Sequence, residues 1–322
     1  MAGRVDRGAN IARLGAIECY PPGRSMNAGH AIITNRPIRP RVLSCILLFF
    51  TYAGYFAALG FFLVALLPVF LLLSLVPPIR ASLMRITLRA FLRYLTFVHL
   101  QVLQIIRIVE CSGFERRPRT PAIYVANHRS SIDGLMLLPL IGTSAAVLKP
   151  KHARKPVFYA LVKLLDFVNM DAGSMAALAV ALEKCRRQIR EGRSLLVFPE
   201  GSRTTAGRLH PFKDFAFRLA IELGVPVVPI IIHSDLPFLN RETGSWFTHQ
   251  RVLFRIRCIE AHYPEPGEDR ADFVRRVHQR MARELASLDS AIAPFLSRRG
   301  GPPPATATLL PGDTPCRKLT SA

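Results

Sequence analysis

Short apolar runs alternate with longer amphipathic segments from about residue 104 to residue 290, and this alternation constrains the fold more than any other feature. Short apolar runs bounded by turn residues are typical of buried strands, and apolar residues with a helical period are typical of helices. The runs predict strands at 105–109, 122–126, 145–148, 194–198, 227–232 and 251–259. The periodic segments predict helices at 130–140, 155–165, 174–191, 213–223 and 271–288. We therefore predict an α/β fold, with a mixed, mostly parallel sheet flanked by helices.

The run from Val42 to Ile79 contains no charged residue and no histidine. About 20 apolar residues cross a bilayer as a helix, so this run is long enough to enter a membrane. We predict an N-terminal hydrophobic membrane-anchoring helical segment at residues 41–79, either a single tilted span or a tight hairpin. Arginines flank the run on both sides, which slightly favours the hairpin, because a hairpin keeps both flanks on one side of the membrane. The alternative is a buried core helix.

The next segment, 80–103, carries arginines at every fourth position, Arg85, Arg89 and Arg93. This spacing places them in one stripe and predicts an interfacial amphipathic helix whose arginines face lipid phosphates. The alternative is an ordinary amphipathic helix packed on the domain that follows. We expect one globular domain at 104–290.

The two ends of the chain lack helical or strand periodicity. Residues 1–40 are rich in Arg, Gly and Pro, and they predict a disordered basic N-terminal segment. Residues 291–322 are rich in Pro, Thr, Ala and Gly, and they predict a disordered tail.

Charge and composition narrow the classes of function. The net charge is +21 and half of the residues are hydrophobic, a combination that suits an anionic membrane surface or phosphorylated substrates. The sequence shows no basic stretch studded with aromatic residues, so we predict no nucleic-acid partner. The six cysteines form no C-x-x-C pair, and we predict no metal site. A G-x-S-x-G motif is absent, which disfavours a serine hydrolase.

A histidine and an aspartate, His128 and Asp133, follow the predicted strand 122–126. A neutral imidazole takes a proton from a hydroxyl, and a carboxylate bound to its other nitrogen fixes the tautomer. A spacing of five residues does not place both side chains on one helix face. The contact therefore requires His128 in the loop and Asp133 in the first turn of a helix capped by Ser130 or Ser131. The alternative role of Asp133 is to stabilise the helix N-terminus through the helix dipole.

A second motif, Glu200-Gly201-Ser202-Arg203-Thr204, follows the predicted strand 194–198 and Pro199. Gly201 allows the backbone to approach a ligand, and Arg203 offers a planar fork to a phosphate. The alternative for Arg203 is a salt bridge with Glu200 that orders the loop. Ligands of such sheets bind beyond the carboxyl ends of the strands, so we expect both motifs at one edge of the sheet.

These motifs resemble the glycerolipid acyltransferase superfamily, of the 1-acyl-sn-glycerol-3-phosphate acyltransferase type. Residues 127–133 resemble its H-x4-D block, and 198–204 closely resemble its third block. Residues 225–230 resemble its proline-bracketed fourth block, and 149–171 stand where the second block belongs. The resemblance covers roughly residues 100–235.

The resemblance implies direct acyl transfer with His128 and Asp133 as catalytic residues. His128 deprotonates the free hydroxyl of 1-acyl-glycerol-3-phosphate, which attacks the thioester of acyl-CoA or acyl-ACP and yields phosphatidic acid. The implied substrate-binding residues are Glu200, Gly201, Ser202, Arg203, Thr204, Lys149 and Lys213.

Each of these residues has an expected role. Backbone amides near Gly201 steady the oxyanion. Arg203 holds the acceptor phosphate with Lys149 or Lys213, and Glu200 orients Arg203 or the acceptor. No cofactor and no metal is implied, since the acyl donor is a co-substrate. The expected partners are the lipid substrate, acyl-CoA or acyl carrier protein, and an anionic membrane surface.

Two departures from the family pattern keep the acceptor open. The stretch from Asp166 to Asp171 lacks the arginine that ends the second block, and Asp214 and Phe215 replace a base and a glycine. Another lyso-lipid acceptor, a lyso-ornithine lipid or lysophosphatidylethanolamine, is the alternative. The expected location is the bacterial inner membrane, with the catalytic domain on the cytoplasmic side. The other histidines, His210 and His233 among them, are predicted to be surface or structural residues.

Overall fold

A seven-stranded sheet of order β1-β7-β6-β2-β5-β3-β4 forms the centre of the protein. The computed structural model describes residues 41–61, 64, 68, 86–87, 89–103, 105–142, 144–148, 166–170, 174–203, 209–239 and 251–297. The strands are β1 Ile106–Ser112, β2 Ile123–Ala126, β3 Ser144–Leu148, β4 Val168–Asn169, β5 Ser194–Val197, β6 Val227–Ser234 and β7 Val252–Cys258. Only β6 and β7 pair antiparallel among these neighbours. The predicted mixed, mostly parallel sheet is confirmed.

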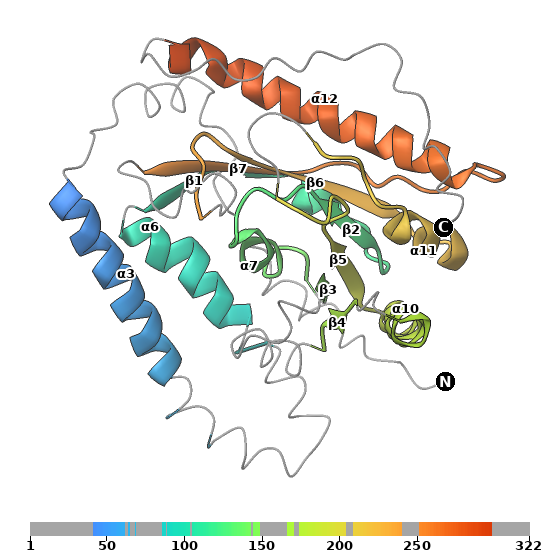
Figure 1. The fold of residues 1–322 in the computed structure, drawn as a ribbon, viewed down its shortest axis with the longest axis horizontal. Helices are drawn as coiled ribbons and strands as arrows, with labels where there is room; N and C mark the ends of the chain where they lie inside the picture. Colours follow the sequence, from blue (N-terminus) through green and yellow to red (C-terminus); the bar gives the residue numbers. More distant parts are fainter. Residues whose placement is uncertain are drawn as a thin grey trace, which may run out of the picture.

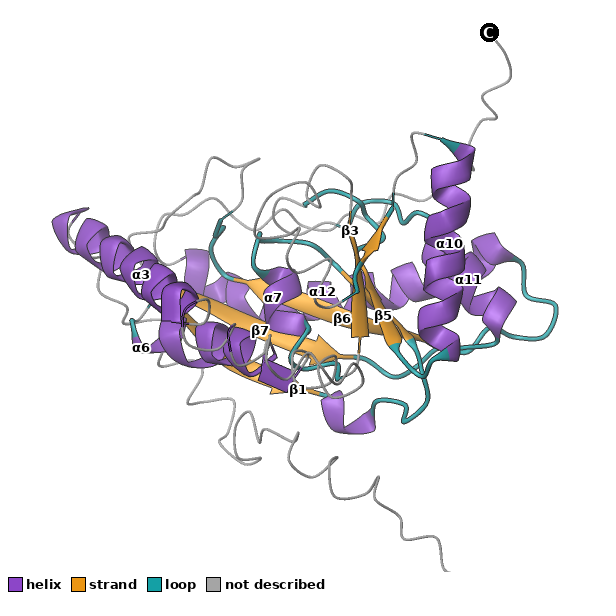
Figure 2. Ribbon diagram, turned by 90° about the horizontal axis from the view of Figure 1, so that it is seen from below, coloured by secondary structure: helices purple, strands orange, loops and turns teal. Residues whose placement is uncertain are grey.

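Helices flank this sheet on both faces (Figures 1 and 2). The helices are α3 Arg41–Phe61, α6 Leu100–Val102, α7 Asp133–Leu137, α10 Met175–Arg190, α11 Phe215–Leu223 and α12 Arg270–Ser297. A π-helical stretch, η2 Tyr94–His99, precedes α6, and a short 3-10 helix, η3 Phe114–Arg116, follows β1. The long helix α12 lies along one face, and α7 and α6 lie on the other (Figure 1).

The central strands are buried along their whole length because helices cover both faces of the sheet. Every residue of β2, β5 and β6 is buried, as is typical of central strands in a parallel sheet. Strand β7 alternates instead, with Arg255 and Arg257 less buried than their neighbours. On α12, an apolar stripe that packs against the core repeats every three or four residues at Phe273, Val277, Met281, Leu285 and Leu288.

Local signals set the ends of two helices as the sequence predicts. Ser174 caps α10, because its side chain accepts a hydrogen bond of 3.1 Å from the backbone N–H of Ala177. Gly192, just after α10, has a φ of +80°. Gly224 ends α11 with a φ of +62° and donates its N–H to the last turn. Glycine adopts this left-handed conformation without the steric cost that a Cβ brings.

Helix α7 is shorter than predicted and starts later. It begins at Asp133, its N-cap residue is Ile132, and no side chain caps it. The predicted capping role of Ser130 or Ser131 is therefore wrong. The Asp133 carboxylate accepts backbone N–H groups of the preceding loop, so this side chain orders the entry to the helix.

The part of the chain that the structure describes contains no membrane-spanning helix of the predicted kind. Within the described residues, no helix is both long enough and apolar enough to cross a bilayer. In the predicted segment 41–79, α3 covers Arg41–Phe61, and Leu47 packs against the hydrophobic core. Beyond Phe61, only positions 64 and 68 of that segment belong to the described residues.

The segment that was expected to lie at the membrane interface packs on the domain. Its Leu92 and Thr96 side chains are each 3% exposed, which fits the alternative of an amphipathic helix packed on the core. Arg85 lies outside the described residues, as do the predicted helix 155–165 and the predicted disordered segment 1–40. Helix α12 continues to Ser297, past its predicted end at residue 288.

Candidate active site

The two sequence motifs meet at one edge of the sheet because their strands are neighbours. Strands β2 and β5 pair in parallel, with Val125 opposite Val197, so the loops that follow them emerge side by side. A hydrogen bond of 3.0 Å joins these loops, from the backbone N–H of His128 to Glu200 Oε1. The expected juxtaposition of the two motifs is therefore present.

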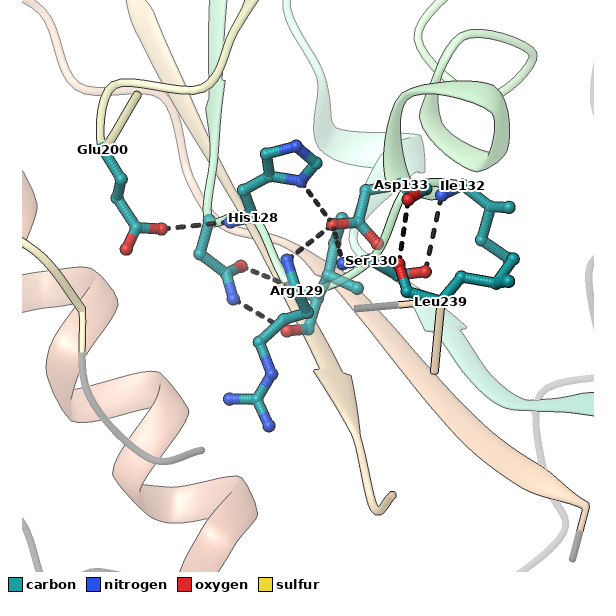
Figure 3. A network of polar contacts seen from close by, with 10 residues as sticks. His128, Arg129, Ser130, Ile132, Asp133, Glu200 and Leu239 are labelled. Carbon is teal, nitrogen blue, oxygen red and sulfur yellow. Dashed lines mark hydrogen bonds and ion pairs between the residues drawn. The ribbon is translucent and has the colours of Figure 1, made fainter. Parts of the chain in front are cut away.

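One carboxylate oxygen organises the loop between β2 and α7 (Figure 3). Asp133 Oδ2 lies 2.8 Å from Nδ1 of His128, and it accepts backbone N–H groups from Arg129 at 2.6 Å and Ser130 at 2.7 Å. The Asp133 side chain is fully buried. Two backbone N–H groups thus already point at this oxygen, which acts toward them as an acceptor.

This contact fixes which nitrogen of His128 carries the proton. Because Oδ2 of Asp133 is an acceptor for its other partners, we assign Nδ1 of His128 as the donor, and Nε2 of the neutral ring then keeps its lone pair. The ring stacks on Phe198, with 4.4 Å between the centroids, and is 22% exposed. His128 is thus held in place on one side and accessible on the other, as a general base requires.

Asn127 ties the start of the loop to the next strand. Its side-chain amide donates to the carbonyl of Ile232 at 2.8 Å and accepts the N–H of the same residue at 2.7 Å. Both partners belong to β6, and Asn127 is fully buried. The residue before His128 therefore has its position fixed by the sheet itself.

Glu200 braces two loops through its two carboxylate oxygens. The carboxylate is 6% exposed, and its second oxygen accepts the backbone N–H of His210 at 2.8 Å. Burial raises the pKa of Glu200, and the two backbone hydrogen bonds act against that shift. Among the described residues, no ion pair joins Glu200 to Arg203. Glu200 therefore orients backbone, including the N–H of His128 itself.

The N–H of Gly201 takes part in a turn of the second motif. It donates to the carbonyl of Phe198 at 3.1 Å, and the φ of Gly201 is +67°. The Lys213 side chain passes over Gly201, since a Cβ added there would lie 3.2 Å from Lys213 Cε. The Lys213 backbone N–H donates to Pro199 at 2.9 Å. The structure thus brings Lys213 to the second motif.

His210 is a site residue that the sequence does not reveal. Its Nδ1 lies 3.1 Å from Oγ of Ser202, and its backbone N–H binds Glu200. The contacts bridge a loop, and no motif spacing marks them. Arg203 is half-buried beside this pair. Thr204 and Lys149, two further predicted substrate-binding residues, lie outside the described residues.

The departure at Asp214 and Phe215 has a structural explanation. Asp214 forms an ion pair of 3.1 Å with Arg270 at the start of α12, and Phe215 packs against the hydrophobic core. Both residues therefore connect α11 to its surroundings. In the second block, Asp166 forms an ion pair of 2.7 Å with Lys184 of α10, while Asp171 lies outside the described residues.

Comparison with known proteins agrees with this geometry. Residues 108–233 match the family model described as Acyltransferase, and the match includes both motifs. This part of the chain is therefore similar to the acyltransferase family.

Similar glycerolipid acyltransferases come from plants and bacteria. The chain is 34% identical over 125 residues to the chloroplastic 1-acyl-sn-glycerol-3-phosphate acyltransferase BAT2 of Brassica napus. The matched stretch covers 38% of this chain and 36% of that protein. The chain is also 31% identical over 189 residues to the 1-acyl-sn-glycerol-3-phosphate acyltransferase of Limnanthes alba. Here the matched stretch covers 55% of this chain and 63% of that protein. The chain thus spans less than two thirds of either relative.

A solved structure shares the fold. The acyltransferase PlsC from Thermotoga maritima superposes with a TM-score of 0.61 at 22% identity, over 78% of this chain and 98% of that one.

We predict that Glu200→Gln destabilises the protein by roughly 1–3 kcal/mol, because the new amide NH2 faces a backbone N–H where a carboxylate oxygen accepted it. Urea unfolding of the full chain measures this change. Glu183→Gln is the control, since Glu183 is an exposed partner of Arg186 and Arg190 and should change the unfolding free energy by less than about 1 kcal/mol. Equal losses in both variants would contradict the bracing role of Glu200.

Proposed function

We propose that this protein transfers an acyl chain from acyl-CoA or acyl-ACP to the free hydroxyl of 1-acyl-sn-glycerol-3-phosphate and so forms phosphatidic acid. The observation that carries the proposal is the contact of 2.8 Å between His128 and Asp133, within the residues that match the Acyltransferase family model. Similar proteins are named 1-acyl-sn-glycerol-3-phosphate acyltransferases, which supports this choice of acceptor.

The proposed reaction needs one proton acceptor and no covalent intermediate on the protein. Nε2 of His128 takes the proton of the acceptor hydroxyl as its oxygen attacks the thioester carbonyl. An ester C–O bond forms, the C–S bond breaks, and the imidazolium returns its proton to the departing thiolate. Asp133 stabilises the imidazolium and keeps the ring oriented throughout, as carboxylates do beside catalytic histidines.

Cations near the second motif suit the phosphate of the acceptor. Arg203 is half-buried, and the Lys213 ammonium lies close to Gly201, 3.6 Å from the position that a Cβ would take there. A guanidinium binds phosphate through two parallel hydrogen bonds, and an ammonium adds a point charge. We assign the acceptor phosphate to these two residues, with Lys149 as a further candidate.

An acceptor panel tests the substrate. Purified full-length protein with labelled acyl-CoA or acyl-ACP should convert 1-acyl-glycerol-3-phosphate, because that acceptor supplies the phosphate that Arg203 and Lys213 suit. Lyso-ornithine lipid and lysophosphatidylethanolamine complete the panel. Product from one of those two, and none from 1-acyl-glycerol-3-phosphate, would contradict the proposed acceptor.

Replacement of the proposed base tests the mechanism. His128→Ala should lower kcat by about 10²- to 10⁴-fold, the range that general-base catalysis contributes. His262→Ala is the matched control, because the backbone of His262 pairs with Val227 at the opposite end of β6, far along the strand from the His128 loop. Steady-state rates of both variants give the comparison, and unchanged acyl transfer in His128→Ala would rule out this mechanism.

We also propose that the protein attaches to a membrane surface, at the cytoplasmic side of a bacterial inner membrane. Helix α3 supports this proposal with large apolar side chains that recur every seven residues, Val42 71% exposed, Phe49 68% and Phe56 62%. Positions seven residues apart lie on one side of a helix, and such a surface inserts into the lipid interface.

Vesicle sedimentation measures this attachment. The double variant Phe49→Ser and Phe56→Ser should bind anionic vesicles at least about fivefold more weakly than the parent chain, because the apolar area that enters the interface is smaller. A double variant of two exposed side chains elsewhere, Met175→Ser and Val180→Ser on α10, is the control. Equal binding by the parent and the α3 variant would exclude α3 as the anchor.

A further inference from the structure

Helix α12 lies outside the matched region 108–233, yet its residue Asp289 connects to the catalytic loop through Arg129. We propose that Asp289 and Arg129 are positioning residues that hold the His128–Asp133 pair in its reactive arrangement. This inference rests on the proposed role of His128 as the base. It makes α12 a part of the catalytic machinery, in addition to its packing on the sheet.

Arg129 has two separate functions in the loop. Its backbone N–H donates to Asp133 Oδ2 at 2.6 Å, next to the bond from His128. Its side chain extends away from the His128 ring, as Figure 3 shows, and is buried with 9% exposure. There Nη2 donates to the carbonyl of Ser234 at the end of β6, at 3.4 Å. The side chain therefore anchors the loop from behind.

A buried guanidinium needs negative charge near it, because removal of an ion from water costs several kcal/mol. Burial lowers the pKa of Arg129, and the charges of Asp289, Asp133 and Glu200 oppose that shift, with Asp289 contributing most. Two of these carboxylates belong to the active site. The largest contribution comes from α12, far along the chain. The position of Arg129 therefore depends on that helix.

His233 holds Asp289 in place. Its Nε2 lies 2.9 Å from Asp289 Oδ1, and the His233 side chain is 3% exposed. Burial lowers the pKa of His233, the hydrogen bond to Asp289 acts against that shift, and the positive charges of Arg129 and, from β7, Arg255 add to it. The lowered pKa favours the neutral ring, whose Nε2–H donates to Asp289.

The apolar stripe of α12 places Asp289 against the sheet. Leu285 and Leu288, on the same helix, are each 2% exposed and belong to the hydrophobic core, so the part of α12 just before Asp289 packs against the sheet. His233 and Ser234 are consecutive residues of β6, and they contact Asp289 and Arg129 respectively. Loop, strand and helix thus meet at one buried charged cluster directly behind the catalytic pair.

Asp289→Asn in the full-length chain tests the inference. The amide retains the hydrogen bond to His233 and removes only the charge near Arg129. We expect kcat to fall at least about tenfold, the scale on which small misplacements of catalytic groups act, with the acceptor KM unchanged within about twofold. Amide hydrogen exchange at Arg129 and Ser130 should become at least about fivefold faster, because the loop opens more often.

The matched control is Glu284→Gln on the same helix. Its carboxylate has the same exposure as that of Asp289, 21%, but it pairs with Arg257 and Arg280. This variant should leave kcat and the exchange of the loop amides unchanged. Equal effects of the two substitutions would mean that α12 contributes stability alone and would overturn the inference.

Arg129→Gln adds a signature that a merely structural contact does not give. Removal of the guanidinium takes away the contact of the loop with Ser234, so kcat should fall while the acceptor KM stays within about twofold. This variant also decides the question if Asp289→Asn does not fold. An unchanged kcat together with unchanged loop exchange would refute the inference. The exchange result is independent of turnover, so it stands apart from a failure of the parent chain to transfer acyl groups.

Discussion

A single buried carboxylate oxygen, Oδ2 of Asp133, accepts hydrogen bonds from His128, Arg129 and Ser130, and the rest of the site depends on this interaction. The loop after β2 has no regular structure of its own that orders it. The negative charge of Asp133 replaces such structure, because it gathers consecutive N–H groups around one point. The same contact selects the tautomer in which His128 can accept a proton, so the order of the loop and its reactivity have one cause.

The order of the strands explains how the surrounding protein supports that loop. Strand β2 lies between β5 and β6, and each neighbour sends a polar contact to it. Glu200, after β5, accepts the N–H of His128, while Asn127 binds β6 through both ends of its amide. The Glu200 and Asn127 side chains are both buried, and shielding from water strengthens their hydrogen bonds. A catalytic loop between two central strands is thereby held on both sides.

Periodicity and motif spacing predict much of this arrangement, and three-dimensional contacts account for what they miss. Strand β6 is predicted over 227–232 because these residues form an apolar run, and the ends of α10 follow from Ser174 and Gly192. The pairing of His128 with Asp133 is predicted from their spacing. The sequence does not predict the partners of Glu200, the approach of His210 to the second motif, or the role of Asp289. Each of these contacts joins segments that no motif spacing connects. The length of apolar sequence after Val42 predicts a membrane segment, whereas Leu47 of α3 packs against the core.

The tautomer of His128 is the most direct measure of whether Asp133 makes this histidine a base. Nitrogen NMR of ¹⁵N-histidine-labelled full-length protein, with His128 assigned from the spectrum of His128→Ala, reports which ring nitrogen carries the proton in the neutral form. The structure predicts protonated Nδ1 and unprotonated Nε2, and a mixture of both tautomers in Asp133→Asn. Protonated Nε2 in the neutral ring of the unaltered protein would contradict the role of His128 as the proton acceptor.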